Sequence, residues 1–273
     1  MDGGAASLRL YGALAAAEFR RYATYRQALF AVMFTNTVFG FLRCYVLLGV
    51  AAGAAGARVA GYDPPRLATY VWIGQGLLGT VAIWEPPDLA DRIRSGDVVA
   101  DLLRPVDPVW QYLAADLGRA GFAGLTRLIG PILVGALAFR LYYPVRPVTY
   151  PLFVVSVALA VVVSLACRYL VNATAYWLLD ARGAQIGWAA VSATFSGMAF
   201  PLAFLPAPLA TALYLATPFP YLIQVPADVL IERRTLPVTV AMVGGQAAWA
   251  VVMLAIARRV QRRAERRLVI QGG

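Results

Sequence analysis

Carboxylate and guanidinium groups crowd one stretch of this 273-residue chain, from Glu85 to Asp116. Seven of the 14 acidic residues fall there, together with Arg92, Arg94 and Arg104. The sequence contains neither Lys nor His, which excludes a Lys-bearing phosphate loop, Schiff-base chemistry, a Ser-His-Asp triad and a zinc or haem site that needs His. The chemistry left to this stretch is ion pairing and hydrogen bonding, so it is expected to dock onto a partner or to be a solvated connector.

The remainder of the sequence is suited to a membrane. Hydrophobic residues make up 60% of the chain and charged residues 14%, with a mean hydropathy of +0.67. Apolar runs such as PLFVVSVALAVVVSLAC are continuous, without the alternation of barrel strands, and are long enough to cross a bilayer as helices. The sequence therefore predicts an all-α polytopic membrane protein in which residues 1–273 form a single transmembrane domain.

Six apolar segments have the length of membrane-spanning helices, about 20 residues each. They are expected at residues 28–50, 67–84, 119–139, 150–171, 186–205 and 238–257. Pro131 is expected to bend the third span, and the fourth can continue as a helix to Leu179. Residues 28–257 thus contain six transmembrane helices.

Three other segments accompany the spans. Residues 1–27 place apolar side chains from Leu8 to Tyr22 on one helical stripe, which predicts an amphipathic interfacial helix; a charged tail leading into the first span is the alternative. Residues 206–236 contain five prolines, which do not suit one straight span and predict a shallow hairpin of short helices in the outer leaflet. Residues 258–273 form a basic tail with six arginines.

The distribution of arginine predicts the orientation in the membrane. Fifteen arginines fall on one side of the membrane and six on the other. Of the fifteen, four precede the first span, five follow the second or fourth span, and six lie in the tail. The fifteen mark the cytoplasmic side, so both termini are expected to be cytoplasmic, as an even number of spans requires. The same distribution relates the net charge of +10 to the membrane, and no nucleic-acid partner is expected.

A first short helix is expected in the cytoplasmic loop at residues 85–118. In PDLADRIR, Leu89 and Ile93 lie four residues apart and therefore share one helix face. Ser95 and Gly96 are expected to end this helix.

A second short helix is expected directly after it. Asp97 can cap its N-terminus, and Pro105 requires it to end near Arg104. Asp101 is expected to face outward. The apolar side chains expected to face inward are Val98, Leu102 and Leu103. Two such helices parallel to the membrane form a unit with an apolar core and a charged rim, suited to docking onto a soluble partner.

Small residues and cysteines predict two further features. Gly74, Gly76 and Gly79 allow a neighbouring helix to approach closely, which predicts a seam with a second copy around the second span. Cys44 and Cys167 are expected toward opposite membrane faces, so no disulfide joins them.

Much of the chain resembles a known family. The segment YVWIGQGLLGTVAIWEPPDLADRIRSGDVVADLLRPVD, at residues 70–107, is similar to the second and third span region of bacterial ABC type-2 permeases, in the branch with a separately encoded ATPase. TPFPYLIQVPADVLI and the terminal VIQGG also resemble that branch. The most specific similarity lies at Gly96, Asp97, Leu102, Leu103, Arg104 and Pro105.

The resemblance implies the permease subunit of an exporter of the ATP-binding-cassette class, located in the bacterial cytoplasmic membrane. Such permeases have an amphipathic N-terminal helix, six spans, a cytoplasmic coupling helix after the second span and an outer-leaflet helical hairpin before the sixth. They work in lipid as pairs, identical or related, beneath two ATPase subunits that bind ATP and Mg²⁺. This chain is then expected to hold no cofactor or metal and to catalyse no reaction.

The resemblance also implies which residues receive the movement of the ATPase. The expected ATPase-coupling residues are Leu89, Ile93, Arg94, Gly96, Asp97, Leu102, Leu103, Arg104 and Pro105. A membrane anchor or assembly subunit that transports nothing, and a secondary transporter, remain the alternatives.

Several polar residues lie within the apolar runs. Asn36, Arg43 and Gln75 are candidates for a translocation pathway, although helix–helix hydrogen bonding or snorkelling of the Arg side chain explains them equally well. Arg127 and Arg168 have no assigned role. No Asp or Glu is evident in the expected spans, which disfavours a proton-driven transporter.

Overall fold

The structure is a computed structural model that describes residues 2–24, 26–53, 60–85, 87–103, 106–178 and 180–271. At residues 2–7, 26–30 and 267–271 it describes the backbone alone. Helices account for 82% of the structure, and no strand occurs among the described residues. The all-α prediction is therefore confirmed.

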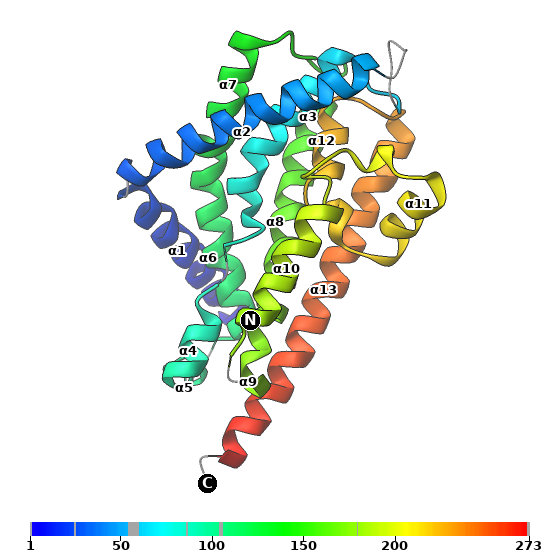
Figure 1. The fold of residues 1–273 in the computed structure, drawn as a ribbon. Coiled ribbons are helices and arrows are strands. Elements are labelled where there is room, and N and C mark those ends of the chain that lie inside the picture. The colour runs from blue at the N-terminus through cyan, green and yellow to red at the C-terminus, as the bar shows by residue number, and fades with distance from the viewer. Residues whose placement is uncertain are drawn as a thin grey trace.

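In chain order, the helices are α1 (Asp2–Thr24), α2 (Arg26–Gly53), α3 (Pro64–Leu77), α4 (Leu89–Ser95), α5 (Val98–Leu102), α6 (Pro108–Ala123), α7 (Ile129–Ala138), α8 (Thr149–Ala173), α9 (Ala175–Leu178), α10 (Arg182–Phe195), α11 (Ala207–Ala216), α12 (Gln224–Leu230) and α13 (Leu236–Gln271). Two π-helical segments extend them: Leu78–Ala82 continues α3, and Gly124–Leu128 joins α6 to α7. In Figure 1, α4, α5, α9 and the C-terminal part of α13 lie at one end of the molecule, and the start of α3 and the end of α7 lie at the opposite end.

Within the described residues, four helical segments are long and apolar enough to cross a membrane. They are Ala31–Gly53, Pro108–Ala138, Thr149–Leu178 and Leu236–Arg266. These segments confirm the prediction of a polytopic membrane protein, and the helical continuation of the fourth expected span is present. The second expected span is the shorter α3 with its π-helical extension, over residues 64–82.

The fifth span, expected at residues 186–205, is not a single helix. α10 ends at Phe195, and Gly197 follows with a φ of +86°, a left-handed conformation that glycine adopts readily. A side chain at Gly197 would not fit either, since its Cβ would lie 2.6 Å from the hydroxyl oxygen of Tyr70. The prediction of one continuous helix was wrong because the close approach to Tyr70 requires a turn at this glycine.

The third expected span begins earlier than predicted. Pro108 occupies the first turn of α6, and the side chain of Asp107 accepts a hydrogen bond from the backbone N–H of Val109 at 3.0 Å. Both features start a helix, so the loop expected at residues 85–118 ends at position 107. The helix stays continuous past Pro131. Pro131 has no backbone N–H to donate to the carbonyl four residues earlier, and the turn before it is accordingly π-helical.

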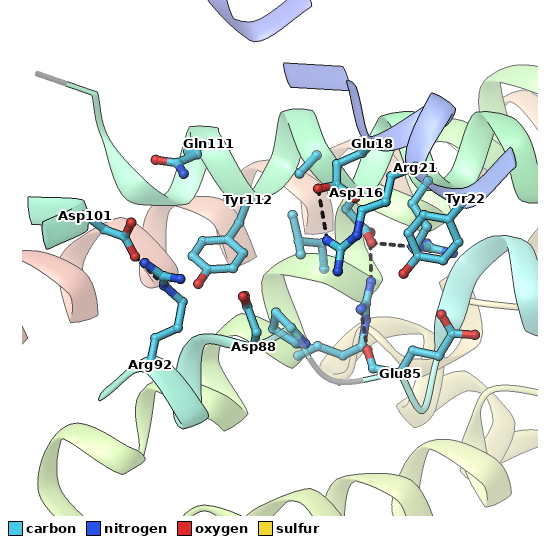
Figure 2. A pocket seen from close by; sticks show the side chains of 15 residues that line it. Glu18, Arg21, Tyr22, Glu85, Asp88, Arg92, Asp101, Gln111, Tyr112 and Asp116 are labelled. Carbon is cyan, nitrogen blue, oxygen red and sulfur yellow. Dashed lines mark hydrogen bonds and ion pairs between the residues drawn. The ribbon is translucent and has the colours of Figure 1, made fainter. Parts of the chain in front are cut away.

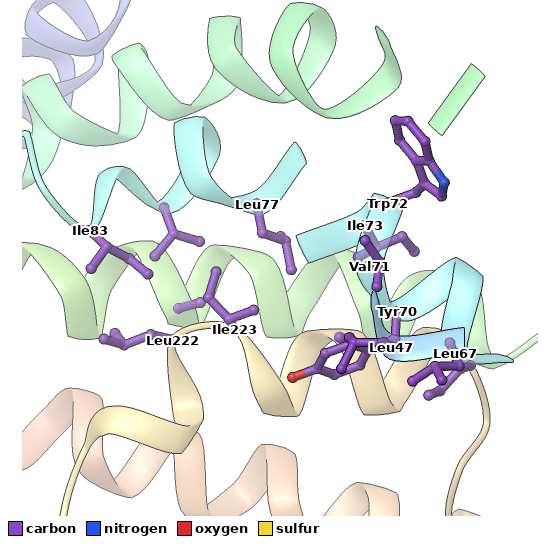
Figure 3. Packing of buried hydrophobic residues seen from close by; sticks show 14 of the residues in the cluster. Leu47, Leu67, Tyr70, Val71, Trp72, Ile73, Leu77, Ile83, Leu222 and Ile223 are labelled. Atoms are coloured by element: carbon purple, nitrogen blue, oxygen red, sulfur yellow. The ribbon is translucent and has the colours of Figure 1, made fainter. Parts of the chain in front are cut away.

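α3 is the central helix of the molecule. Its residues from Leu67 to Ile83, which carry no charge, are almost all buried among α2, α7, α8 and α12. Figure 3 shows Tyr70, Trp72 and Leu77 within this core. Between helices in lipid, close packing and hydrogen bonds supply the association, since lipid tails are as apolar as the side chains.

Two glycines of this central helix allow close packing inside the chain. A Cβ on Gly76 would lie 2.8 Å from the Cα of Leu128, and one on Gly79 would lie 2.5 Å from the Cδ of Arg127. Their neighbour is therefore the π-helical segment between α6 and α7 of the same chain. The predicted seam with a second copy at these two glycines was wrong.

The terminal and late segments differ in exposure. α1 packs along α6, where the rings of Phe19 and Phe122 meet edge to face with centroids 5.6 Å apart, whereas Leu8 at the start of the predicted stripe is exposed. Two short helices, α11 and α12, occur within residues 206–236, where a hairpin was expected. α12 is buried against α8, whereas α11 leaves Leu209 and Leu215 exposed.

Candidate functional site

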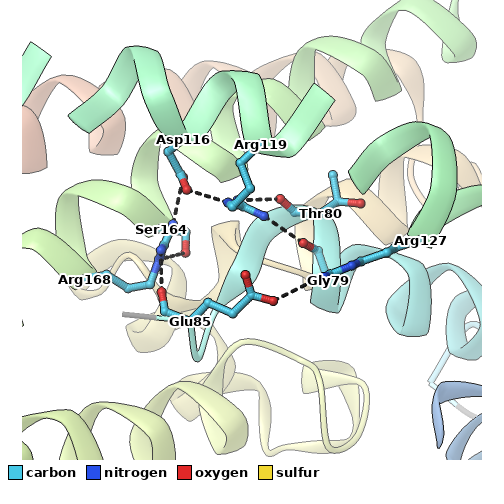
Figure 4. Close-up of polar contacts among 8 residues, drawn as sticks. All are labelled: Gly79, Thr80, Glu85, Asp116, Arg119, Arg127, Ser164 and Arg168. Atoms are coloured by element: carbon cyan, nitrogen blue, oxygen red, sulfur yellow. Dashed lines mark hydrogen bonds and ion pairs between the residues drawn. The ribbon is translucent and has the colours of Figure 1, made fainter. Parts of the chain in front are cut away.

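An ion-pair network of Asp116, Arg119 and Arg168 lies where α3, α6 and α8 meet (Figure 4). Asp116 accepts a hydrogen bond from Nε of Arg119 at 2.7 Å and another from Nη2 of Arg168 at 2.8 Å. All three side chains are buried. Because a buried charge costs several kcal/mol, about 3–5 when its partner is removed, each of these groups depends on the others.

The same arginines bind the end of the α3 helix. Arg119 donates to the carbonyl oxygens of Gly79 at 2.9 Å and Thr80 at 3.0 Å. Arg168 donates to the carbonyl oxygen of Glu85 at 2.6 Å. The last carbonyls of a helix have no donor within the helix, so Arg119 satisfies two of them and joins α6 to α3, while Arg168 joins α8 to the turn that follows.

The chain leaves α3 through a constrained turn. Ala82 has a φ of +53°, a left-handed conformation that is unfavourable for a residue with a side chain. Three residues later, the carboxylate of Glu85 accepts a hydrogen bond from Nη1 of Arg127 at 2.7 Å. The turn is thus bound by Arg127, in the segment between α6 and α7, and by Arg168 of α8.

The α4–α5 knob (residues 89–103) follows this turn. Leu89 and Val98 are buried, and Ile93 packs against the same cluster, so the predicted shared face of Leu89 and Ile93 is confirmed. The cluster members from other helices are Val109, Tyr169, Ala173, Tyr176, Ala257 and Ala264. The knob is therefore seated on α6, α8, α9 and the extended part of α13.

Gly96 and Asp97 join the two helices of the knob. Gly96 ends α4 with a φ of +85°, a position that glycine favours at helix C-termini. Asp97 occupies the N-cap position of α5, but its carboxylate accepts a hydrogen bond from Oγ of Ser95 at 2.8 Å instead of from the backbone. The end of α4 was correctly predicted, and the side-chain cap by Asp97 was wrong.

α5 is rotated relative to the prediction. Asp101 is buried and accepts a hydrogen bond from Nε of Arg92 at 2.5 Å, which raises the pKa of Arg92. Leu103 is 82% exposed and Leu102 is half-buried. The predicted outward Asp101 and inward Leu103 were both wrong, because a five-residue helix is oriented by its ion pair to α4 and not by an apolar stripe.

The other expected coupling residues lie at the rim of the knob. Arg94 is exposed and pairs with Asp91 through a 2.6 Å contact. Arg104 and Pro105 lie outside the described residues.

A groove with a volume of about 650 Å³ separates α5 from the extended part of α13. Its α5 side carries the apolar residues Val99, Leu102, Leu103, Val106 and Pro108. Its α13 side carries Arg258, Gln261, Arg262 and Glu265. Nε of Arg258 donates to Asp107 at 3.0 Å and joins the two sides. The groove thus combines an apolar wall with a mainly basic one.

A polar cavity of about 340 Å³ lies between α1, the knob and α6 (Figure 2). Glu18, Arg21 and Tyr22 of α1 line it, as do Arg92 and Asp101 of the knob. The residues of the ion-pair network, Asp116, Arg119 and Arg168, also line it. α1 therefore covers a polar space that extends from the knob to the network.

Two of the three expected pathway residues lie close together. Nη1 of Arg43 is 4.0 Å from the position that a Cβ on Gly74 would take, and Gln75 is the next residue of α3. The guanidinium nitrogens of Arg43 and both amide atoms of Gln75 are buried without a hydrogen-bond partner. Asn36 is half-buried and lies two turns before Arg43 on α2.

Two buried carboxylates were missed from the sequence. Asp116 lies within the candidate span Pro108–Ala138, so the prediction of spans without Asp or Glu was wrong. The three-residue spacing of Asp116 and Arg119 within an apolar helix was the available signal. Asp228 of α12 is also buried and pairs with Arg233 through a 3.1 Å contact.

Comparison with known proteins gives one match. Residues 36–272 match the family model described as ABC-2 family transporter protein. No curated protein and no solved structure matches the chain. The matched range contains the network, the knob, the groove and the Arg43–Gln75 region, and leaves α1 outside.

Proposed function

Because the chain belongs to the ABC-2 family of transporter proteins, we propose that it is the permease subunit of an ATP-binding-cassette exporter with a separate ATPase. Two ATPase subunits and a second permease, identical or related, complete the proposed complex in a bacterial cytoplasmic membrane. ATP and Mg²⁺ bind to the ATPase in this proposal, since the sequence lacks the Lys of a phosphate loop.

The observation that carries the proposal is the link from the knob to the membrane helices. The knob continues from the turn at Glu85, which is bound by Arg127 and by Arg168 of α8. Arg119 of α6 binds the last carbonyls of the α3 helix. A displacement of the knob therefore acts on α3, α6 and α8 together.

Nucleotide binding to the ATPase supplies the displacement. Closure of the two ATPase subunits moves the knob and favours one of two arrangements of the membrane helices. A ligand shifts such an equilibrium only as far as its affinities for the two states differ. The ion-pair network suits this transmission, because separating its members would leave charges buried without partners.

The surface that receives the ATPase is the groove beside α5. Val99 and Leu103 are large apolar side chains that are exposed on the knob, and such exposed apolar groups mark interaction surfaces. Arg258 and Arg262 lie across the groove. This arrangement fits an apolar ridge of the ATPase that is flanked by carboxylates.

The topology follows from the same proposal. α3 with its extension is the second crossing, and α10 with the segment after it is the fifth, which gives six crossings with both termini in the cytoplasm. Neighbouring helices bury most of α3 and so cover the backbone groups at its ends, as non-helical backbone within a bilayer requires. The α11–α12 hairpin enters the outer leaflet, and α1 lies at the cytoplasmic interface.

Co-purification with an ATPase tests the proposal. The tagged permease is purified from its native membrane in mild detergent, and an ATPase is expected to co-purify and to hydrolyse ATP faster in the complex. Leu103→Gln is expected to weaken this association roughly tenfold. Val145→Gln, at an equally exposed apolar residue (79%) of the opposite end, is the control.

The alternatives give different outcomes. A permease that transports without any ATPase would be a secondary transporter, and one that binds no ATPase and transports nothing would be a membrane anchor. Either result contradicts the proposal. The pairing of Asp116 with two arginines supports ATP-driven over proton-driven transport, because a carboxylate held between two cations is a poor proton carrier.

A further inference from the structure

In the described part of the chain, buried side-chain atoms without a hydrogen-bond partner are concentrated on α2 and α3. Six of the seven such atoms belong to Arg43, Trp72 and Gln75. Five of the six are nitrogens, which donate, and one is the amide oxygen of Gln75. The thiol of Cys44, a weak acceptor, lies beside the indole nitrogen of Trp72. Unsatisfied buried donors cost free energy, and these donors outnumber the one unsatisfied acceptor.

Arg43 directs its charge into the protein. The residue is partly exposed, yet its three guanidinium nitrogens are buried beside Gly74. An Arg in a membrane helix ordinarily extends its charged head toward water. A guanidinium stays protonated in proteins, so Arg43 cannot remove the cost of burial by losing a proton. A bound anion would compensate this buried positive charge.

The carboxylates at the end of the molecule where α3 starts are already paired. The three ion pairs there are Asp63 with Arg66, Asp228 with Arg233, and Glu232 with Arg146. An identical second copy therefore has no unpaired carboxylate at this end to offer to Arg43. The anion that fits the cluster belongs to a different molecule.

The outer flank of α2 fits an apolar tail. Phe39, Leu42 and Val46 are exposed there, within one turn of Arg43 along the helix. A headgroup bound by Arg43 and Gln75 would place an attached tail along these side chains. The combination of a donor cluster and an apolar flank fits an amphipathic anion.

We propose that Arg43 and Gln75 form a binding site for the anionic headgroup of an amphipathic molecule. The nitrogens are enclosed in this structure, so α2 must move away from α3 to admit the headgroup. A bound anion then favours that open arrangement, because it has its partners only there. The inference rests on the proposed function only in assigning this movement to the transport cycle. A membrane lipid and a transported compound share this chemistry.

Native mass spectrometry of the detergent-purified permease, without ATPase or ATP, tests the site. The anionic probes are dioleoylphosphatidylglycerol and dodecyl phosphate, and dioleoylphosphatidylcholine is the control with no net charge. Wild type is expected to bind at least one anionic probe roughly tenfold more tightly than Arg43→Gln or Gln75→Leu. Arg140→Gln, which removes an exposed arginine, is expected to bind like wild type. Preference for phosphatidylglycerol identifies a lipid site, and preference for dodecyl phosphate identifies a site for a transported compound.

Thermal unfolding provides a second measurement that does not depend on the binding assay. Arg43→Gln removes a buried unpaired charge, so it is expected to unfold at or above the wild-type midpoint without a probe. The favoured anionic probe should raise the midpoint of wild type and leave that of Arg43→Gln unchanged.

Three results would overturn the site. They are equal anion binding by wild type and Arg43→Gln, an equal loss of binding in Arg140→Gln, and a change from dimer to monomer in Arg43→Gln with unchanged anion binding. The last result would assign Arg43 to a contact between permeases. Because the assay contains no ATPase, its failure leaves the proposed coupling intact, and a failure of coupling leaves this site intact.

Discussion

Arg168 donates a hydrogen bond from Nη1 to the backbone carbonyl oxygen of Glu85 at 2.6 Å. The same guanidinium binds Asp116 through Nη2 at 2.8 Å. One side chain thus joins α8 to α6 and to the turn between α3 and the knob. A buried charge binds that turn, and in the proposed mechanism this contact transmits movement of the knob to the membrane helices.

Arg168→Gln is expected to separate assembly from coupling. The ATPase should still co-purify, because the groove proposed to receive it is intact. The stimulation of ATP hydrolysis by the permease should fall roughly tenfold, since the bond from Arg168 to the turn before the knob is lost. Arg182→Gln, which removes an exposed arginine paired with Asp180, is the control. Unchanged stimulation in Arg168→Gln would contradict this role.

Asp116→Asn should destabilise the protein strongly. It leaves Arg119 and Arg168 buried with no counter-charge, which is expected to lower the free energy of unfolding by about 3–5 kcal/mol. Adding Arg168→Gln to this variant should restore part of the loss, because one of the unpaired charges is then removed. Denaturant unfolding of the two single variants and the double variant measures this coupling. Strictly additive losses would show that the three charges do not act as a unit.

Gly118→Ala is expected to release α1 from α6. A Cβ at Gly118 would lie 2.0 Å from the carbonyl oxygen of Ala15, a backbone atom that cannot move aside. Trypsin should then cleave faster after Arg20 and Arg21 of α1. Gly121→Ala is the matched control one turn later, where the nearest atom would be a ring carbon at an ordinary 3.6 Å. Equal cleavage rates in the two variants would contradict the close helix contact.

Glu232 makes stability depend on pH at the opposite end of the molecule. Burial by itself raises the pKa of Glu232, but hydrogen bonds from Thr149, Tyr142 and the backbone N–H of Arg146 outweigh it and lower the pKa to about 2, from an ordinary 4.5. The ionised group therefore stabilises the fold fully above pH 4.5, and this contribution is lost as the pH falls toward 2.

Thermal unfolding of wild type and Glu232→Gln across this pH range measures the effect. The midpoint of wild type should exceed that of the variant by a constant amount above about pH 5, and the difference should shrink as the medium is acidified. A difference that persists undiminished at pH 3 would mean that the carboxylate charge is not the stabilising feature.

Features fixed by local sequence were predicted well. The long apolar runs became helices, Gly96 ended α4, and Leu89 and Ile93 share a buried face because helical spacing alone determines it. The ends of the helices depended on single residues that the hydropathy pattern hides. Pro108 started α6 early, and Gly197 followed the end of α10.

Features decided by tertiary contacts were not predictable from the pattern. The orientation of Asp101 depends on Arg92 in the preceding helix, and the exposure of Leu103 follows from it. The ion-pair network was missed because Asp116 was assigned to a loop and its partner Arg168 lies on another helix. The pairing of such distant residues is a property of the packed fold alone.

Cysteine labelling at Leu103 tests whether the knob faces the cytoplasm and binds the ATPase. The two native cysteines, Cys44 and Cys167, are buried and form no disulfide, as predicted, so a cysteine in Leu103→Cys is the one that a membrane-impermeant maleimide reaches. Labelling is expected in inside-out vesicles and not in intact cells, and bound ATPase is expected to protect the cysteine. Labelling from outside the cell, or labelling that the ATPase does not reduce, would contradict the proposal.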